Sequence, residues 1–221
     1  MDDQYHQVVP RPSGAERLGA PSWAGAAPSF EQLASFVASL PPAAADQADA
    51  SVLVPVYAGP GGPVVVLIRR SRLLADDPGH VAFPGGRIEA GESAKDAALR
   101  EAGEEVGLER AAITALASLG VFWRRNRWVA AFVALIPAPP HLVAERNEVD
   151  ALLEVPLAEL VAADACWEER WGDRPMFFFA RPATAAGGPG DLVWGLTARI
   201  LSELLSGAGA VAVPAIGLGN R

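Results

Sequence analysis

Two almost uninterrupted apolar runs, residues 52–57 and 64–69, follow one another in the first third of the chain. Five residues that are all glycine or proline, 59–63 with the sequence GPGGP, separate them, and this composition is typical of a hairpin turn. A strand with one face in water alternates apolar and polar residues, whereas these two runs are nearly all apolar. We therefore expect both runs to be central strands of one sheet.

The rest of the chain predicts a mixture of strands and helices. Further strands are expected at residues 81–83, 117–123, 128–136 and 176–181. Helices are expected at residues 29–40, 93–106, 157–162 and 192–205. Strands dominate the middle and do not alternate strictly with helices, so the pattern favours an α+β or mixed α/β sandwich over a doubly wound sheet.

The length of 221 residues suggests one domain with loose ends. Residues 1–28 are rich in proline, alanine and glycine and have no periodicity, so they are expected to form a flexible N-terminal arm. The folded domain is expected at residues 29–206. Residues 207–221 are small and apolar, and they are expected to form a loose C-terminal tail. The alternative is that this tail covers a partner subunit in a homodimer.

Composition excludes several classes of protein. The formal net charge is −8, so sequence-independent binding of nucleic acid is not expected, and any action on anionic phosphates would need a cation as mediator. The single cysteine, Cys166, excludes an internal disulfide. No signal peptide is visible, and the longest apolar run, around residues 128–140, is shorter than the roughly 18 residues of a membrane span. A cytoplasmic protein without a membrane partner is expected.

The predicted helix 93–106 carries signals at both ends and a cluster of acids. Ser93 with Asp96 three residues later resembles a capping box, and Gly107 stands where a left-handed cap is needed. At 100° per residue, three glutamates fall within about 100° of one face, and they are Glu101, Glu104 and Glu105. Such hard oxygen ligands beside a glycine-rich turn suit Mg²⁺ or Mn²⁺, although three glutamates alone are also typical of a solvated helix face.

The spacing around this helix is more specific than the glutamates alone. Seven residues fit the pattern Gly-x5-Glu-x7-Arg-Glu-U-x-Glu-Glu-x-Gly-U, where U is a bulky aliphatic residue: Gly86, Glu92, Arg100, Glu101, Glu104, Glu105 and Gly107. At ordinary frequencies of about 7% each, seven fixed residues coincide by chance with a probability on the order of 10⁻⁸ per start position. This pattern is the Nudix box, so the chain resembles the Nudix hydrolases. Ala102 at the first U position is a mild departure.

The resemblance implies an α/β/α sandwich around a mixed β-sheet, with the box as loop–helix–loop, and hydrolysis of a diphosphate linked to another group. It implies Mg²⁺ or Mn²⁺ bound by Glu101, Glu104 and Glu105 with the backbone at Gly86 close by. It also implies that Glu92 pairs with Arg100 and that four box residues serve catalysis: Glu104, Glu101, Arg100 and Glu92. Glu104 is one candidate for the catalytic base. A loop acid such as Glu145 or Glu148 is another, although both residues are interpreted equally well as ordinary surface acids.

Residues before the box resemble the signature of the coenzyme A diphosphatases within this family. The matching positions, expected to bind substrate, are Arg70, Ser71, Phe83 and Gly85; Gly79 and residues 192–200 also match. The departures are Ala75 in place of arginine, and Asp77 and His80 in place of histidine and glutamine. A basic residue is the natural partner of the 3′-phosphate of coenzyme A, so Arg69, Arg70, Arg72 or Arg87 compensates for Ala75, or the substrate differs.

Three functions therefore stay open. The first is hydrolysis of coenzyme A or its acyl derivatives to adenosine 3′,5′-bisphosphate and 4′-phosphopantetheine. The second is hydrolysis of other small nucleoside diphosphate derivatives, such as ADP-ribose, dinucleotides or nucleoside triphosphates. The third is a Nudix-fold binding module without catalysis, which the complete set of box glutamates disfavours. A basic cluster at Arg124, Arg125 and Arg127 is either a grip for phosphates or a solvated hairpin tip.

Overall fold

The computed structural model describes residues 9–41, 47–181 and 190–209. Its helices are α1 (Phe30–Ser39), α2 (Ala94–Val106), a 3-10 turn (Arg110–Ala112), α3 (Leu157–Leu160) and α4 (Gly195–Gly207). Its strands are β1 (Glu16–Gly19), β2 (Ala50–Gly59), β3 (Gly62–Arg70), β4 (Val81–Ala82), β5 (Gly85–Arg87), β6 (Ala115–Arg124), β7 (Arg127–Ile136), β8 (Val149–Pro156), β9 (Cys166–Trp171), β10 (Arg174–Arg181) and β11 (Asp191–Val193).

The predicted apolar hairpin lies at the centre of the larger sheet. This sheet has the strand order β4-β3-β2-β7-β6, with β5 also paired to β2 and β8 to β3. β2 runs parallel to β7 and antiparallel to β3, so the sheet is mixed. Because β2 and β3 have a neighbour on both sides and helices over both faces, their side chains are apolar throughout, and the expected α+β architecture is confirmed.

β2 and β3 separate beyond their hairpin, and the glycine-rich turn lies between them within the sheet. The two strands pair only beside their hairpin turn, from Val56 opposite Val65 to Gly59 opposite Gly62. Farther along, β5 pairs with the start of β2 and β4 pairs with the end of β3. Residues 81–87 therefore fill the gap where the two central strands separate, and Gly85 and Gly86 lie in the middle of the sheet rather than on an outer loop.

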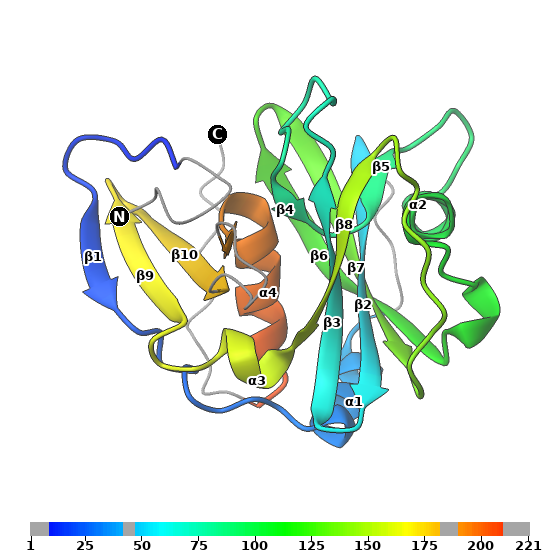
Figure 1. Ribbon diagram of the computed structural model, residues 1–221, viewed down its shortest axis with the longest axis horizontal. Helices are drawn as coiled ribbons and strands as arrows, with labels where there is room; N and C mark the ends of the chain where they lie inside the picture. Colours follow the sequence, from blue (N-terminus) through cyan, green and yellow to red (C-terminus); the bar gives the residue numbers. More distant parts are fainter. Residues whose placement is uncertain (1–8, 42–46, 182–189, 210–221) are drawn as a thin grey trace.

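The molecule has four layers (Figure 1). α2 covers one face of the larger sheet, where its Ala98, Ala102 and Val106 pack against residues such as Leu53 and Phe132. α1 and α4 cover the other face, and α4 also contacts β10 of a second sheet with the order β1-β9-β10-β11. Helix α4 thus lies between the two sheets, and the second sheet is a layer that the sequence did not predict.

The N-terminal segment corrects one expectation. Residues 16–19 pair with β9 as strand β1, and the side chain of Trp23 is 1% exposed and stacks on Phe179 with ring centroids 5.4 Å apart. The prediction of a loose arm is therefore wrong for residues 9–28, because a single buried tryptophan in a segment without periodicity gives no pattern to detect. Residues 1–8 lie outside the described part of the chain, as do residues 210–221 of the predicted tail.

The last predicted helix also begins later than expected. Leu192 and Val193 belong to β11, and the helix starts at Gly195, whose φ of 64° turns the chain out of the strand. The expected helix 157–162 ends at Leu160. Among the described residues, no helix is both long enough and apolar enough to span a bilayer.

The burial of Trp23 gives the first prediction. Trp23→Ala leaves a cavity beside Phe177 and Phe179 of β10, so the free energy of unfolding should fall by about 3–5 kcal/mol in a denaturant titration. Leu18→Ala is the control, because Leu18 is 45% exposed on β1 and its loss should change stability by less than about 0.5 kcal/mol. Equal midpoints for Trp23→Ala and the parent protein would contradict this packing.

Candidate active site

Helix α2 has both predicted ends, and they fix the position of its acids. The Ser93 side chain accepts the backbone N–H of Asp96 at 3.1 Å, and Gly107 adopts a left-handed conformation with φ 67°. Glu104 and Glu105 therefore lie in the last turn of α2, which contains no basic residue. Carboxylates are unfavourable there because the helix C-terminus carries partial negative charge, so this end of α2 needs a cation nearby.

Arg100 supplies one such cation and connects the loop before the helix to the acids. Its guanidinium donates two hydrogen bonds to Glu92, at 3.0 and 3.1 Å, as the resemblance implied. It also donates to Glu101 at 3.0 Å, to Glu104 at 2.9 Å and to the Arg87 carbonyl at 3.1 Å. One side chain therefore holds three carboxylates and the loop backbone together.

Glu105 is the most deeply placed acid of the site, with 2% of its surface exposed. Its Oε2 accepts the backbone N–H of Gly85 at 2.8 Å, and its Oε1 lies 3.9 Å from Nη1 of Arg70. Burial raises the pKa of Glu105 to about 7, against the hydrogen bond from Gly85 and the charge of Arg70. The same cause raises the pKa of Glu101, and Arg100 opposes it.

Gly86 leaves space for the Glu101 carboxylate. Gly86 pairs with Ser51 of β2, and a Cβ at this position would overlap the carboxylate of Glu101. At Gly85 a Cβ would instead overlap the backbone of Ser51 and Val52. Both glycines are thus required by close approach, one to the acidic helix and the other to the neighbouring strand.

The donor set fits a divalent cation. Glu101, Glu104 and Glu105 offer hard oxygen ligands beside the Gly86 backbone, and the Ser51 hydroxyl is fully buried next to it with no hydrogen-bond partner among the described residues. Within this part of the chain, no three acidic, histidine or cysteine side chains are already grouped around one point. The reason is Arg100, which holds Glu101 and the largely exposed Glu104.

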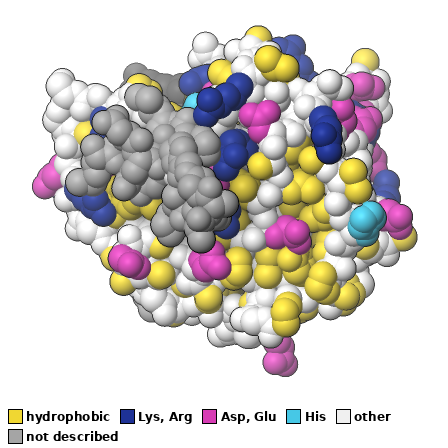
Figure 2. Space-filling view, viewed as in Figure 1, with side chains coloured by type: hydrophobic (Ala, Val, Ile, Leu, Met, Phe, Trp, Pro, Cys, Tyr) yellow, Lys and Arg dark blue, Asp and Glu magenta, His cyan; other side chains and the backbone are white. Residues whose placement is uncertain are grey.

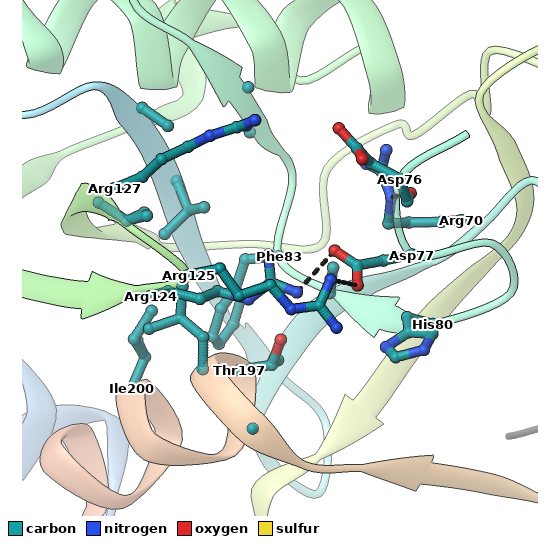
Figure 3. A pocket seen from close by; sticks show the side chains of 18 of the residues that line it. Arg70, Asp76, Asp77, His80, Phe83, Arg124, Arg125, Arg127, Thr197 and Ile200 are labelled. Carbon is teal, nitrogen blue, oxygen red and sulfur yellow. Dashed lines mark hydrogen bonds and ion pairs between the residues drawn. The ribbon is translucent and has the colours of Figure 1, made fainter. Parts of the chain in front are cut away.

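A cavity of about 490 Å³ opens beside this site, and Figure 3 shows it from close by. Three of the four residues expected to bind substrate line it, and they are Arg70, Phe83 and Gly85. Ser71 does not: its side chain is buried and accepts the backbone N–H of Leu73 at 3.3 Å, which stabilises the turn after β3. The spacing of the signature residues gave no sign of this difference.

The two loop acids named as candidate bases differ in their surroundings. Glu145 accepts hydrogen bonds from the backbone N–H groups of Asn147 and Glu148, so its carboxylate closes its own loop. The side chain of Glu148 makes no such bond with any residue that the structure describes. Burial is the main cause that raises the pKa of Glu101 and of Glu105, and the charge of Glu148 adds to it at both residues, which places Glu148 near the site.

The cavity also contains two departures from the coenzyme A signature, Asp77 and His80, beside the basic cluster of the β6–β7 turn. Asp77 accepts from Arg124 at 2.6 Å and from Arg125 at 3.1 Å, so it ties the loop before β4 to the turn between β6 and β7. Burial alone would raise the pKa of Asp77, but the hydrogen bond and charge of Arg124, with Arg125 and His80, bring it below its ordinary value. His80 packs against Trp194 with ring centroids 5.5 Å apart. These contacts join positions 47 and 114 residues apart, which no local pattern signals.

Comparisons with known proteins identify the family of this chain. The family model for the NUDIX domain matches residues 48–177. The "Uncharacterized Nudix hydrolase NudL" of Klebsiella pneumoniae subsp. pneumoniae is 34% identical over 173 residues, which cover 76% of this chain and 86% of the relative. "Nudix hydrolase 3" of Caenorhabditis elegans is 31% identical over 141 residues, 60% of this chain and 59% of that protein. A solved MutT/nudix family protein from Enterococcus faecalis aligns with a TM-score of 0.49 and 20% identity, over 79% of this chain and 66% of that one.

The two adjacent glycines predict different outcomes on substitution. Gly86→Ala displaces only the flexible end of Glu101, so we expect near-parental stability with turnover reduced by about 100-fold. Gly85→Ala pushes against backbone, so we expect the free energy of unfolding to fall by about 1–3 kcal/mol or more. Thermal unfolding and a diphosphate hydrolysis assay measure both effects, and the reverse pattern would contradict the geometry.

Glu105 gives a separate prediction. Glu105→Gln keeps an oxygen that accepts from Gly85 but removes the buried charge, so the protein should fold with a Tm close to that of the parent. Replacing a residue that only hydrogen-bonds to a metal ligand typically lowers metal affinity or activity by about 10- to 100-fold. Replacing a metal ligand itself should therefore reduce kcat by more than about 100-fold. Full activity in the folded variant would remove Glu105 from the metal site.

Proposed function

The chain belongs to the Nudix family, and from that premise we propose that this pyrophosphohydrolase cleaves the diphosphate of coenzyme A or its acyl derivatives. The oxygen of a water molecule would form a new bond to phosphorus while the bridging oxygen leaves with the other phosphate. The products would be adenosine 3′,5′-bisphosphate and 4′-phosphopantetheine.

One observation carries the proposal. The acidic face of α2 and the cavity share the Gly85–Gly86 segment, so a diphosphate bound beside the glutamates has the rest of its substrate directed into the cavity. The cavity takes residues from the coenzyme A signature on one side, Arg70 and Phe83, and from the matching C-terminal segment on the other, Trp194 and Thr197. The segments matching that subgroup thus meet at one place.

Mg²⁺ or Mn²⁺ is the cofactor that these residues suit. Glu101 and Glu105 would be the main ligands, with Glu104 and the backbone at Gly86 beside them. Such an ion, when bound, neutralises charge on the diphosphate and lowers the pKa of water. The role of Arg100 is to keep Glu92, Glu101 and Glu104 on one side of the loop, so it positions ligands while Arg70 faces the cavity.

A carboxylate must accept the proton of the attacking water. Glu104 fits because its side chain is largely exposed, so a change of its own rotamer would release the carboxylate from Arg100. Glu148 also fits, because its charge acts on both Glu101 and Glu105 and its carboxylate makes no hydrogen bond within the described part of the chain. Glu145 fits less well, because its carboxylate is occupied by Asn147 and by the backbone of Glu148.

Hydrolysis of other nucleoside diphosphate derivatives is the second candidate, and Asp77 favours it. At a position where the coenzyme A signature has a different residue, Asp77 pairs with two arginines of the cavity, Arg124 and Arg125, and offsets one of their two positive charges. Ala75 removes a further positive charge from the same loop. A substrate with fewer phosphates than coenzyme A, such as ADP-ribose, would tolerate both changes.

A panel of diphosphates distinguishes these candidates. The protein would be incubated with Mg²⁺ or Mn²⁺ and coenzyme A, acetyl-coenzyme A, ADP-ribose, NADH, diadenosine polyphosphates or nucleoside triphosphates, and the products identified by mass spectrometry. We expect 4′-phosphopantetheine from coenzyme A, and none from the Glu105→Gln control. Cleavage of the other compounds with coenzyme A intact would move the substrate to the second candidate.

A further inference from the structure

The cavity is strongly basic in an otherwise acidic protein. Five arginines and only two acids, Asp76 and Asp77, line it, although the whole chain has a net charge of −8. The arginines are Arg70, Arg87, Arg124, Arg125 and Arg127. Figure 2 shows basic side chains gathered at the end of the molecule where Figure 1 places the turn between β6 and β7. Such a local excess of positive charge attracts anionic ligands.

Three of these arginines already have partners. Arg70 donates to the backbone carbonyl of Asp76 at 3.4 Å and lies near Glu105. Arg124 and Arg125 are both paired with Asp77 (Figure 3). In contrast, Arg87 and Arg127 make no side-chain hydrogen bond or ion pair with any residue in the described ranges.

The register of the sheet brings Arg87 and Arg127 to the same face. Arg87 of β5 lies opposite Ala50 of β2, and Ala50 lies opposite Val129 of β7. Side chains along a strand alternate between faces, so Arg127, two residues before Val129, projects from the same face as Arg87. Figure 3 shows Arg127 apart from the Asp77 cluster and extended along the cavity wall.

That face is opposite the metal side of the sheet. The missing Cβ of Gly86 points to Glu101 on α2, and the next residue, Arg87, therefore points away from α2. An anion held by Arg87 and Arg127 would thus lie on the opposite face of the sheet from a diphosphate beside the glutamates. The first turn of α4, whose Trp194 supplies no side-chain cap, borders the same cavity, and a helix N-terminus favours negative charge.

We propose that Arg87 and Arg127 form a specificity subsite for a phosphate monoester that the substrate carries in addition to its scissile diphosphate. This inference rests on the proposed function and adds to it the group that selects the substrate. It also explains how the chain tolerates Ala75: Arg69 is paired with Asp191 at 2.8 Å, whereas Arg87 is available and gains Arg127 as a second donor. Two guanidinium groups suit the several oxygens of one phosphate.

The test compares substrates that differ by one phosphate. Steady-state kinetics would be measured with coenzyme A and 3′-dephospho-coenzyme A for the parent protein, Arg87→Ala, Arg127→Ala and the control Arg174→Ala, an exposed arginine of β10 outside the cavity lining. We expect the parent to prefer coenzyme A by at least about tenfold in kcat/KM, mainly through KM. Each cavity variant should lose most of this preference, because its kcat/KM falls for coenzyme A and not for 3′-dephospho-coenzyme A. Arg174→Ala should keep the preference.

Two kinetic outcomes would overturn the subsite. One is a parent enzyme that hydrolyses both compounds equally well. The other is an equal loss on both compounds in Arg87→Ala and Arg127→Ala, because the arginines would then serve the diphosphate itself.

A binding measurement separates this inference from the proposed function. Calorimetry without added metal would compare adenosine 3′,5′-bisphosphate with AMP, which lacks the 3′-phosphate. If coenzyme A is not hydrolysed but the bisphosphate binds at least about tenfold more tightly, and Arg127→Ala removes the difference, the subsite stands and the proposed substrate fails. If the parent binds both compounds equally, the subsite is refuted whatever the substrate of the enzyme.

Discussion

The ion-pair network of Arg100 is the interaction on which the rest of the site depends. Glutamates at the C-terminal end of a helix repel one another and the helix dipole, so α2 would not keep this face without a cation in contact. Arg100 meets that need from within the helix and reaches the preceding loop through Glu92 and the carbonyl of Arg87. The same side chain thus organises the loop, the helix and the acids, and it leaves Glu105 to be held by the Gly85 backbone.

The second constraint is the separation of β2 from β3. Strands that paired along their whole length would leave no room for residues 81–87 at the centre of the sheet. Because they separate, Gly85 and Gly86 reach the acidic helix on one face while Arg87 reaches the cavity on the other. A single short strand therefore gives the site two sides, one facing the acids of α2 and one facing the arginine-lined cavity.

Local signals predicted the parts of the fold that local interactions determine. The apolar hairpin and the caps of α2 at Ser93 and Gly107 were predicted from local patterns, and the pairing of Glu92 with Arg100 was predicted from the family resemblance. The second sheet was not predicted, because β1 is short and polar and β9 mixes tryptophan with charged residues, so neither strand has an apolar pattern. The cavity was only partly readable, because its lining joins segments more than 100 residues apart, and only tertiary packing brings these together.

The division of the cavity between the family core and its flanking segments has an evolutionary consequence. Residues 48–177 contain the whole acidic helix, whereas the wall from Trp194 to Ile200 comes from a segment after that core. Changes in the flanking segment can therefore reshape what the cavity accepts without touching the groups that cleave the diphosphate. A change of cavity shape and a change of the acidic helix are therefore independent events in the sequence, because residues 194–200 and residues 94–106 lie in separate segments.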